Sequence, residues 1–341
     1  MLPASWFSKK DLPIETQVLF VLSAFSLIFC LANSSVNTSA SAQSPVLSDR
    51  KHDTPGQQIR PGGSVHVDVD LALVNVSVTD AHDRPVTFLE RDSFRIFEDN
   101  IEQEVLNFSS EDVPVSIGVI LDLSGSMANK FHYAKEAAVQ FFKTANPDDE
   151  GFLIGFSGHA DLLSPFTNNI EELQNRLLTV SPSGSTALLD GLYLGMSEMR
   201  DARNAKRALL IISDGGDNHS RYSEDDIKRL VREADVQLYA IGIFDSGYHR
   251  RTLTEFNGPL LLAELTELTG GRVFSVRNPN ELSEIATKIG TELHSQYILG
   301  FRPSNKARGA RWRKIAVKVG SRNGPQHLSV RAKKGYYAHT F

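Results

Sequence analysis

The sequence predicts an α/β fold: a doubly wound, mostly parallel sheet flanked by helices, with a small β-sandwich-like module beside it. Apolar segments of strand length alternate with amphipathic segments of helix length between residues 113 and 295. On both sides of that stretch the apolar residues instead alternate with polar ones at a period of two. Oxygen-bearing loops follow two of the apolar segments, where parallel sheets bind ligands.

The centre of the expected sheet is Val115–Leu121, a nearly continuous apolar run typical of a strand buried on both faces. A helix is expected directly after it, because apolar residues recur at three- and four-residue steps from Met127 to Ala145. Pro147 ends that helix.

The same alternation predicts the rest of the α/β domain. The further strands expected are 151–156, 162–166 at an edge, 207–212, 236–244 and 272–276. The further helices expected are 170–178, 187–199, one opened by the cap Ser223, 260–269 and one from Asn278 to His294.

The flanking segments predict a separate β module. Residues 64–110 show alternating patterns, first over Val65–Leu71 and then over Val74–Val78, and residues 296–341 contain three further strand-like runs. Neither flank has enough strands to be stable alone, so we expect the two flanks to pack together as one module.

The N-terminus has the composition of an export signal. Residues 1–42 combine Lys9 and Lys10 with the apolar run Val18–Ala32 and the small residues Ala40-Ser41-Ala42, which predicts a signal peptide. The alternative is an uncleaved anchor, the one expected membrane contact. Residues 43–63 are polar and predict a flexible linker. We therefore expect the body of the protein to be periplasmic, on the cell surface or secreted. Its only cysteine, Cys30, lies in the apolar run, so no disulfide is expected in that body.

Charge argues against a general polyanion binder. The formal net charge is −5, so no nucleic-acid partner is expected. Residues 295–341 nevertheless hold eleven Lys or Arg and no Asp or Glu. We interpret this basic tail as a solvated strand face that discourages aggregation. The alternative is an anionic envelope polymer at Arg311-Trp312-Arg313-Lys314.

Three loops carry short oxygen side chains. Asp122-Leu123-Ser124-Gly125-Ser126 follows the central strand, Ser183-Gly184-Ser185-Thr186 precedes a helix, and Ser213-Asp214-Gly215 follows the strand 207–212. Carboxylate and hydroxyl oxygens without His or Cys favour a hard divalent cation, most of all Mg²⁺, with Mn²⁺ or Ca²⁺ as alternatives.

In order and spacing, these loops resemble the metal-ion-dependent adhesion site of the von Willebrand factor A domain family. The resemblance implies that Ser124, Ser126 and Thr186 bind the metal directly, and that Asp122 and Asp214 act directly or through water. We expect this site at the surface, so that Asp122→Ala would leave the fold intact. Asp217 and Asn218 are expected mainly to shape their loop.

The function implied is an exported, non-enzymatic module that captures an acidic residue of a partner protein through the cation. Alternatives are a scaffold or assembly partner in the cell envelope, a hydrolase, or a partner of an AAA-type ATPase. Enzyme signatures are missing: Ser157 lacks the GxSxG pattern, and His132, His159, His219 and His249 form no HExxH motif. We expect those histidines at the surface.

Overall fold

The computed structural model describes residues 71–243, 253–276, 278–305, 311–320 and 327–338. By its contacts the chain divides into residues 1–64 and 65–341, and every described residue belongs to the second unit. The expected signal segment or anchor, the linker, Val65–Val69, Phe244, His249 and the turn 321–326 lie outside the described residues. Within the described ranges, no helix is long and apolar enough to cross a membrane.

The α/β domain is built on a six-stranded sheet in the order β10-β9-β8-β5-β6-β7. Its strands are β5 (Val115–Asp122), β6 (Glu150–Phe156), β7 (Ala160–Thr167), β8 (Lys206–Ser213), β9 (Gln237–Ile243) and β10 (Val273–Val276). Only the edge strand β7 runs antiparallel to its neighbour. Every residue of β5 is buried, as the apolar run predicted, so the expected fold class is confirmed.

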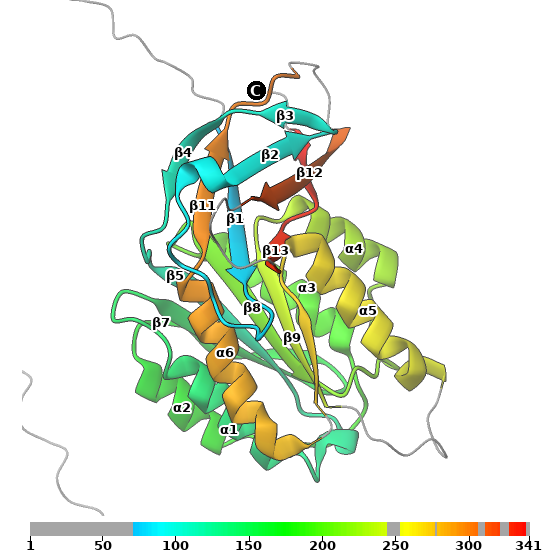
Figure 1. Ribbon diagram of the computed structural model, residues 1–341. Helices are drawn as coiled ribbons and strands as arrows, with labels where there is room; N and C mark the ends of the chain where they lie inside the picture. The colour runs from blue at the N-terminus through cyan, green and yellow to red at the C-terminus, as the bar shows by residue number, and fades with distance from the viewer. Residues whose placement is uncertain (1–70, 244–252, 277, 306–310, 321–326, 339–341) are drawn as a thin grey trace, which may run out of the picture. The chain divides into compact units, whose positions relative to one another are not determined.

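Helices cover both faces of this sheet (Figure 1). One face packs against α1 (Phe131–Phe142), α2 (Ile170–Leu178) and α6 (Leu282–His294). The other packs against α3 (Leu188–Glu198), α4 (Glu224–Glu233) and α5 (Leu253–Thr269). Four short 3-10 turns complete the described helical structure: η1 (Arg91–Ser93), η2 (Gly125–Met127), η3 (Met199–Asp201) and η4 (Pro279–Glu281).

The helix after β5 begins later than the sequence pattern predicted. The α-helix starts at Phe131, not at Met127, although Met127 is fully buried as expected. The reason is a long-range contact: the amide of Gly125 donates to the carbonyl of Gly184, 3.0 Å away. This bond holds the 3-10 turn against the loop before α3, so the regular helix begins only after Lys130.

Strands from the two flanks are combined in two four-stranded sheets, ordered β13-β1-β11-β4 and β14-β12-β2-β3. The strands are β1 (Ala72–Thr79), β2 (Phe94–Glu98), β3 (Ile101–Gln103), β4 (Val105–Ser109), β11 (Tyr297–Phe301), β12 (Arg311–Val319), β13 (Ser329–Ala332) and β14 (Gly335–Ala338). Apolar side chains of both sheets, such as Val76, Ile96 and Leu299, form one core.

Arg313 is an exception to the solvated strand face expected for most of the basic tail. It is only 6% exposed, and its guanidinium lies 3.2 Å from the carboxylate of Glu98, which is 2% exposed. Tyr336 donates a further hydrogen bond to the same carboxylate. Because alternate residues of a strand face opposite sides, Arg313 points into the sandwich, away from the face that carries Trp312 and Lys314.

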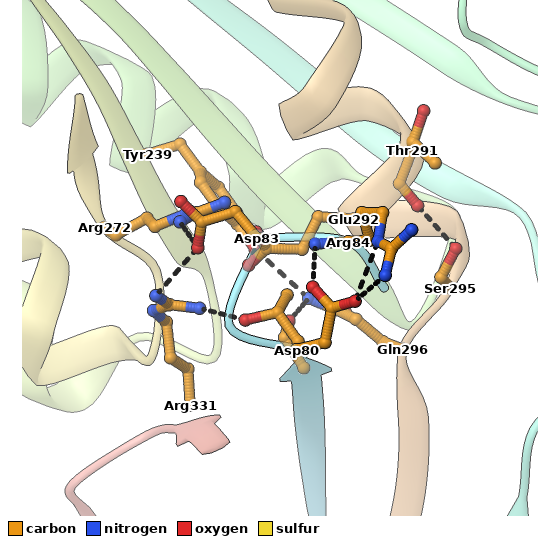
Figure 2. A network of polar contacts seen from close by, with 12 residues as sticks. Asp80, Asp83, Arg84, Tyr239, Arg272, Thr291, Glu292, Ser295, Gln296 and Arg331 are labelled. Carbon is orange, nitrogen blue, oxygen red and sulfur yellow. Dashed lines mark hydrogen bonds and ion pairs between the residues drawn. The ribbon is translucent and has the colours of Figure 1, made fainter. Parts of the chain in front are cut away.

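A polar network, buried at Glu292 and Tyr239 and exposed at Asp83, joins the β module to the α/β domain (Figure 2). Arg272, just before β10, pairs with Asp83 at 2.8 Å and with Glu292 of α6 at 2.9 Å. Glu292 also accepts a hydrogen bond from the hydroxyl of Tyr239 on β9. Arg272 is thus held between a turn of the β module and the final helix of the α/β domain.

Candidate metal centre

The predicted site lies where the adjacent strands β5 and β8 end. Asp122 is the last residue of β5, and Asp214 directly follows β8. Their carboxylates are close enough to interact electrostatically. Ser124 and Ser126 follow Asp122, and their hydroxyl oxygens lie 3.0 Å apart. Two hydroxyls and two carboxylates therefore lie together at the carboxyl edge of the sheet.

Asp122 is fully buried, which corrects the expectation of a surface residue. One carboxylate oxygen accepts a hydrogen bond from the amide of Ser124 at 2.9 Å, and the other accepts one from the hydroxyl of Ser213 at 2.6 Å. With both oxygens engaged in this way, Asp122 is suited to holding the turn and acting on a cation through water. Its substitution by alanine would leave buried polar groups without partners.

Burial, followed by the neighbouring charge of Asp214, raises the pKa of Asp122 to about 6. The hydrogen bonds from Ser124 and Ser213 oppose this rise but do not cancel it. Two carboxylates that repel each other at a sheet edge are stabilised by a cation placed between them and solvent. The electrostatics of the described residues therefore fit a divalent ion.

The loop that carries Thr186 is held against the Asp122 turn by backbone bonds. The Ser183 amide donates to the Leu123 carbonyl at 2.6 Å, and Gly125 bonds to Gly184 as described above. Gly184 has a φ of +85°, a left-handed conformation that glycine adopts without strain. Thr186 itself is only 6% exposed. The structure thus places this loop at the same sheet edge as the two serines.

Asn218 and Asp217 position the Thr186 loop, in agreement with the role expected for them. The Asn218 side-chain oxygen accepts a hydrogen bond from the Thr186 backbone amide at 3.0 Å. The Asn218 backbone amide donates to the Thr186 carbonyl at 2.9 Å. Asp217 accepts from the amide of Leu189 at 2.9 Å, at the start of α3. Their side chains are therefore committed to the backbone of the neighbouring loop.

Two residues of the site were given no role from the sequence. Ser213, fully buried, links Asp122 to the amide of Gly215. Lys130 places its ammonium group 3.9 Å from a carboxylate oxygen of Asp214 and 3.4 Å from the Ile243 carbonyl. Ser213 directly precedes Asp214 at a strand end, which is a usable signal. Nothing in the local pattern distinguishes Lys130 from other helix-start lysines.

The donor set is not a cluster of His, Cys, Asp or Glu ligands. Among the residues that the structure describes, no group of three or more His, Cys, Asp or Glu side chains could hold a metal. His132, His159 and His219 are exposed, as expected. The site instead combines hydroxyls with only two carboxylates, a set suited to a hard cation that keeps open positions.

Residues 117–216 match the family model of the von Willebrand factor type A domain. This segment is a von Willebrand factor type A domain. The match contains Asp122, Ser124, Ser126, Thr186 and Asp214, and it includes strands β5, β6, β7 and β8.

Alignments with similar proteins are longer than this segment. An uncharacterized protein of Borreliella burgdorferi is 24% identical over 184 residues, which is 48% of this chain and 54% of that protein. Human inter-alpha-trypsin inhibitor heavy chain H3 is 27% identical over 146 residues, or 38% of this chain and 16% of that protein. A von Willebrand factor type A structure from Catenulispora acidiphila has a TM-score of 0.46 at 13% identity, covering 79% of this chain and 72% of that chain. The chain thus spans about half the length of the bacterial relative and a small part of the human one.

Proposed function

We propose that this protein is an exported, non-enzymatic binding module that captures a carboxylate of a partner protein through a divalent cation. Ser124, Ser126 and Thr186 would bind the cation directly. Asp122 and Asp214 would bind it either directly or through water. The observation that carries the proposal is the pair of serine hydroxyls 3.0 Å apart, beside two interacting carboxylates at one sheet edge.

The chemistry of this donor set supports binding rather than hydrolysis. Three neutral hydroxyls bring little negative charge to a cation, so the bound ion would remain electrophilic toward an external carboxylate. Mg²⁺ is the ion we propose, with Mn²⁺ and Ca²⁺ as alternatives. Ser126 is exposed, so this side of the site is open to a partner, whereas Asp122 is buried and serves as support.

Calorimetric titration of the full chain with Mg²⁺ and with Mn²⁺ tests the site. Ser126→Ala should weaken binding at least about tenfold without altering the fold, because the side chain is exposed and bonds only to Ser124 among the described residues. Ser185→Ala, in the loop beside Thr186, is the matched control and should bind the metal like the parent chain. Equal affinities for the parent chain and Ser126→Ala would reject the assignment.

Capture of a partner needs a second experiment. A pull-down from envelope extract should recover a protein in Mg²⁺ and release it in EDTA. The Ser126→Ala chain should recover none of it. Retention of the same partner in EDTA would show that recognition does not pass through the cation.

A further inference from the structure

The β module has an outward face that carries aromatic and basic side chains. In the sheet β14-β12-β2-β3, Trp312 lies opposite Tyr337, and Ala316 lies opposite Phe97. Since side chains alternate along a strand, these residues and Lys314 share one face, while Arg313 and Ile315 face the sandwich core. This outward face is separate from the metal centre, which lies at the carboxyl ends of β5 and β8.

The same face forms one wall of a groove of about 540 Å³. Trp312 and Tyr337 meet there edge to face, with ring centres 5.3 Å apart, and Phe97 continues the aromatic wall. Arg232 of α4 and Leu268 of α5 form the opposite wall. Grooves of this size, with apolar walls and a few polar groups, are typical of ligand sites.

The charges lining the groove all have one sign. Arg232, Lys314 and Lys334 line it, and no Asp or Glu does. Lys334 lies 3.2 Å from Glu267, which is 71% exposed and screened by solvent. Arg232 and Lys314 make no ion pair with any residue in the described ranges. On a chain with a net charge of −5, this local surplus of cations favours an anionic ligand.

We propose that this groove binds a stretch of acidic polysaccharide whose sugars carry carboxylates. The apolar face of a sugar ring packs on aromatic side chains such as Trp312, and the carboxylates pair with Arg232, Lys314 and Lys334. An acidic peptide fits less well, because a sheet face offers side chains rather than a free backbone edge for strand addition. Stacked bases also fit less well, because the Trp312 and Tyr337 rings lie at 67° to each other and so do not offer parallel faces to successive bases.

Tryptophan fluorescence tests this proposal on the full chain. The chain has two tryptophans, Trp6 and Trp312, so a Trp6→Phe variant leaves Trp312 as the only reporter. Titration with polygalacturonate in EDTA should change the Trp312 emission saturably, whereas neutral dextran should not. Affinity should fall at least about tenfold between 50 and 200 mM salt, as for other polyanions that release counterions. Because EDTA is present throughout, the result does not depend on the metal centre.

Charge removal supplies the second readout. The double variant Arg232→Gln, Lys314→Gln should bind polygalacturonate at least about fivefold more weakly, the loss expected for two exposed ion pairs. Lys288→Gln, on α6 and 48% exposed, is the matched control and should change nothing. Equal binding of polyglutamate or of oligothymidylate would overturn the saccharide assignment. An unchanged affinity of the double variant would show that the polysaccharide does not bind in this groove.

Discussion

Replacement of Asp122 by asparagine should stabilise the protein in the absence of metal. The pKa of this carboxyl is raised from its ordinary value of 3.8 to about 6, chiefly by burial and then by Asp214. The folded state therefore holds the proton more tightly than the unfolded chain, so stability is lost as the pH rises from about 4 to about 6. Above that range the ionised carboxylate costs the folded state about 3 kcal/mol.

Asparagine removes the charge, keeps one of the two local hydrogen bonds and reverses the direction of the other. Its carbonyl oxygen can accept from the Ser124 amide, and its amide can donate to the Ser213 hydroxyl, which has a spare lone pair. In EDTA at about pH 7.5, Asp122→Asn should therefore raise the free energy of unfolding by about 1–3 kcal/mol. At about pH 4 the gain should shrink to about 0.5 kcal/mol, because the carboxyl is then mostly protonated in the folded state.

Urea unfolding followed by circular dichroism measures both effects, with Asp225→Asn on the exposed start of α4 as the charge control. Mg²⁺ at about a hundred times its dissociation constant should stabilise the parent chain by about 2.7 kcal/mol. It should not stabilise Asp122→Asn to the same extent. If Asp122→Asn is less stable than the parent chain in EDTA at neutral pH, hydrogen bonding outweighs charge at this site and the electrostatic reasoning is wrong.

Three further predictions test the supporting structure. Burial lowers the pKa of His294, but hydrogen bonds to Asp149 and Asp112 outweigh burial and raise the pKa above 6.5. The protonated imidazole therefore stabilises the folded state fully below pH 6.5, and this contribution is lost as the pH rises through the raised pKa. In His294→Gln, the free energy of unfolding should depend less on pH across that range. Gly258→Ala should lower the free energy of unfolding by about 1–3 kcal/mol and weaken metal binding in calorimetry, because its Cβ would lie 1.8 Å from the Gly215 carbonyl oxygen. Gly320→Ala, with open space around its Cβ, should change neither quantity. Arg313→Gln should lower the free energy of unfolding in urea by about 3–5 kcal/mol, because Glu98 would stay buried without its charged partner. Arg311→Gln, exposed on the same strand, should change it by no more than about 0.5 kcal/mol.

Elements with strong periodicity could be predicted from the sequence, and their contacts could not. The bounds of α2 agree residue for residue with the pattern Ile170–Leu178, and the run Val115–Leu121 became a strand buried throughout. The start of α1 depends instead on a bond from Gly125 to Gly184, residues far apart in the sequence. Local patterns carry no information about such pairings. The expected helices and strands are therefore present, but some helices begin or end at other residues than the pattern predicted.

The donor residues of the candidate site could likewise be chosen from local motifs, because strand ends and short oxygen side chains are visible in one sequence. Their environment was not visible. Asp122 is buried and accepts a hydrogen bond from Ser213 on a neighbouring strand, a contact that local sequence does not reveal. Arg313 was interpreted as part of a basic surface, although strict alternation already separates it from Trp312 and Lys314. That division is present in the period-two pattern of the tail itself.

The buried contacts of α6 bear on whether metal binding could displace this final helix. Near its C-terminal end, Glu292 is paired with Arg272 and hydrogen-bonded to Tyr239, and His294 is held by Asp112 and Asp149. A sliding helix would leave these groups buried and unpaired, at a cost of about 3–5 kcal/mol for a broken buried ion pair. A single bound cation would have to favour the displaced position by at least that amount. We therefore expect a rigid binding domain, in which hydrogen exchange across residues 282–294 stays the same when Mg²⁺ is added; faster exchange there would show that the helix moves despite these pairs.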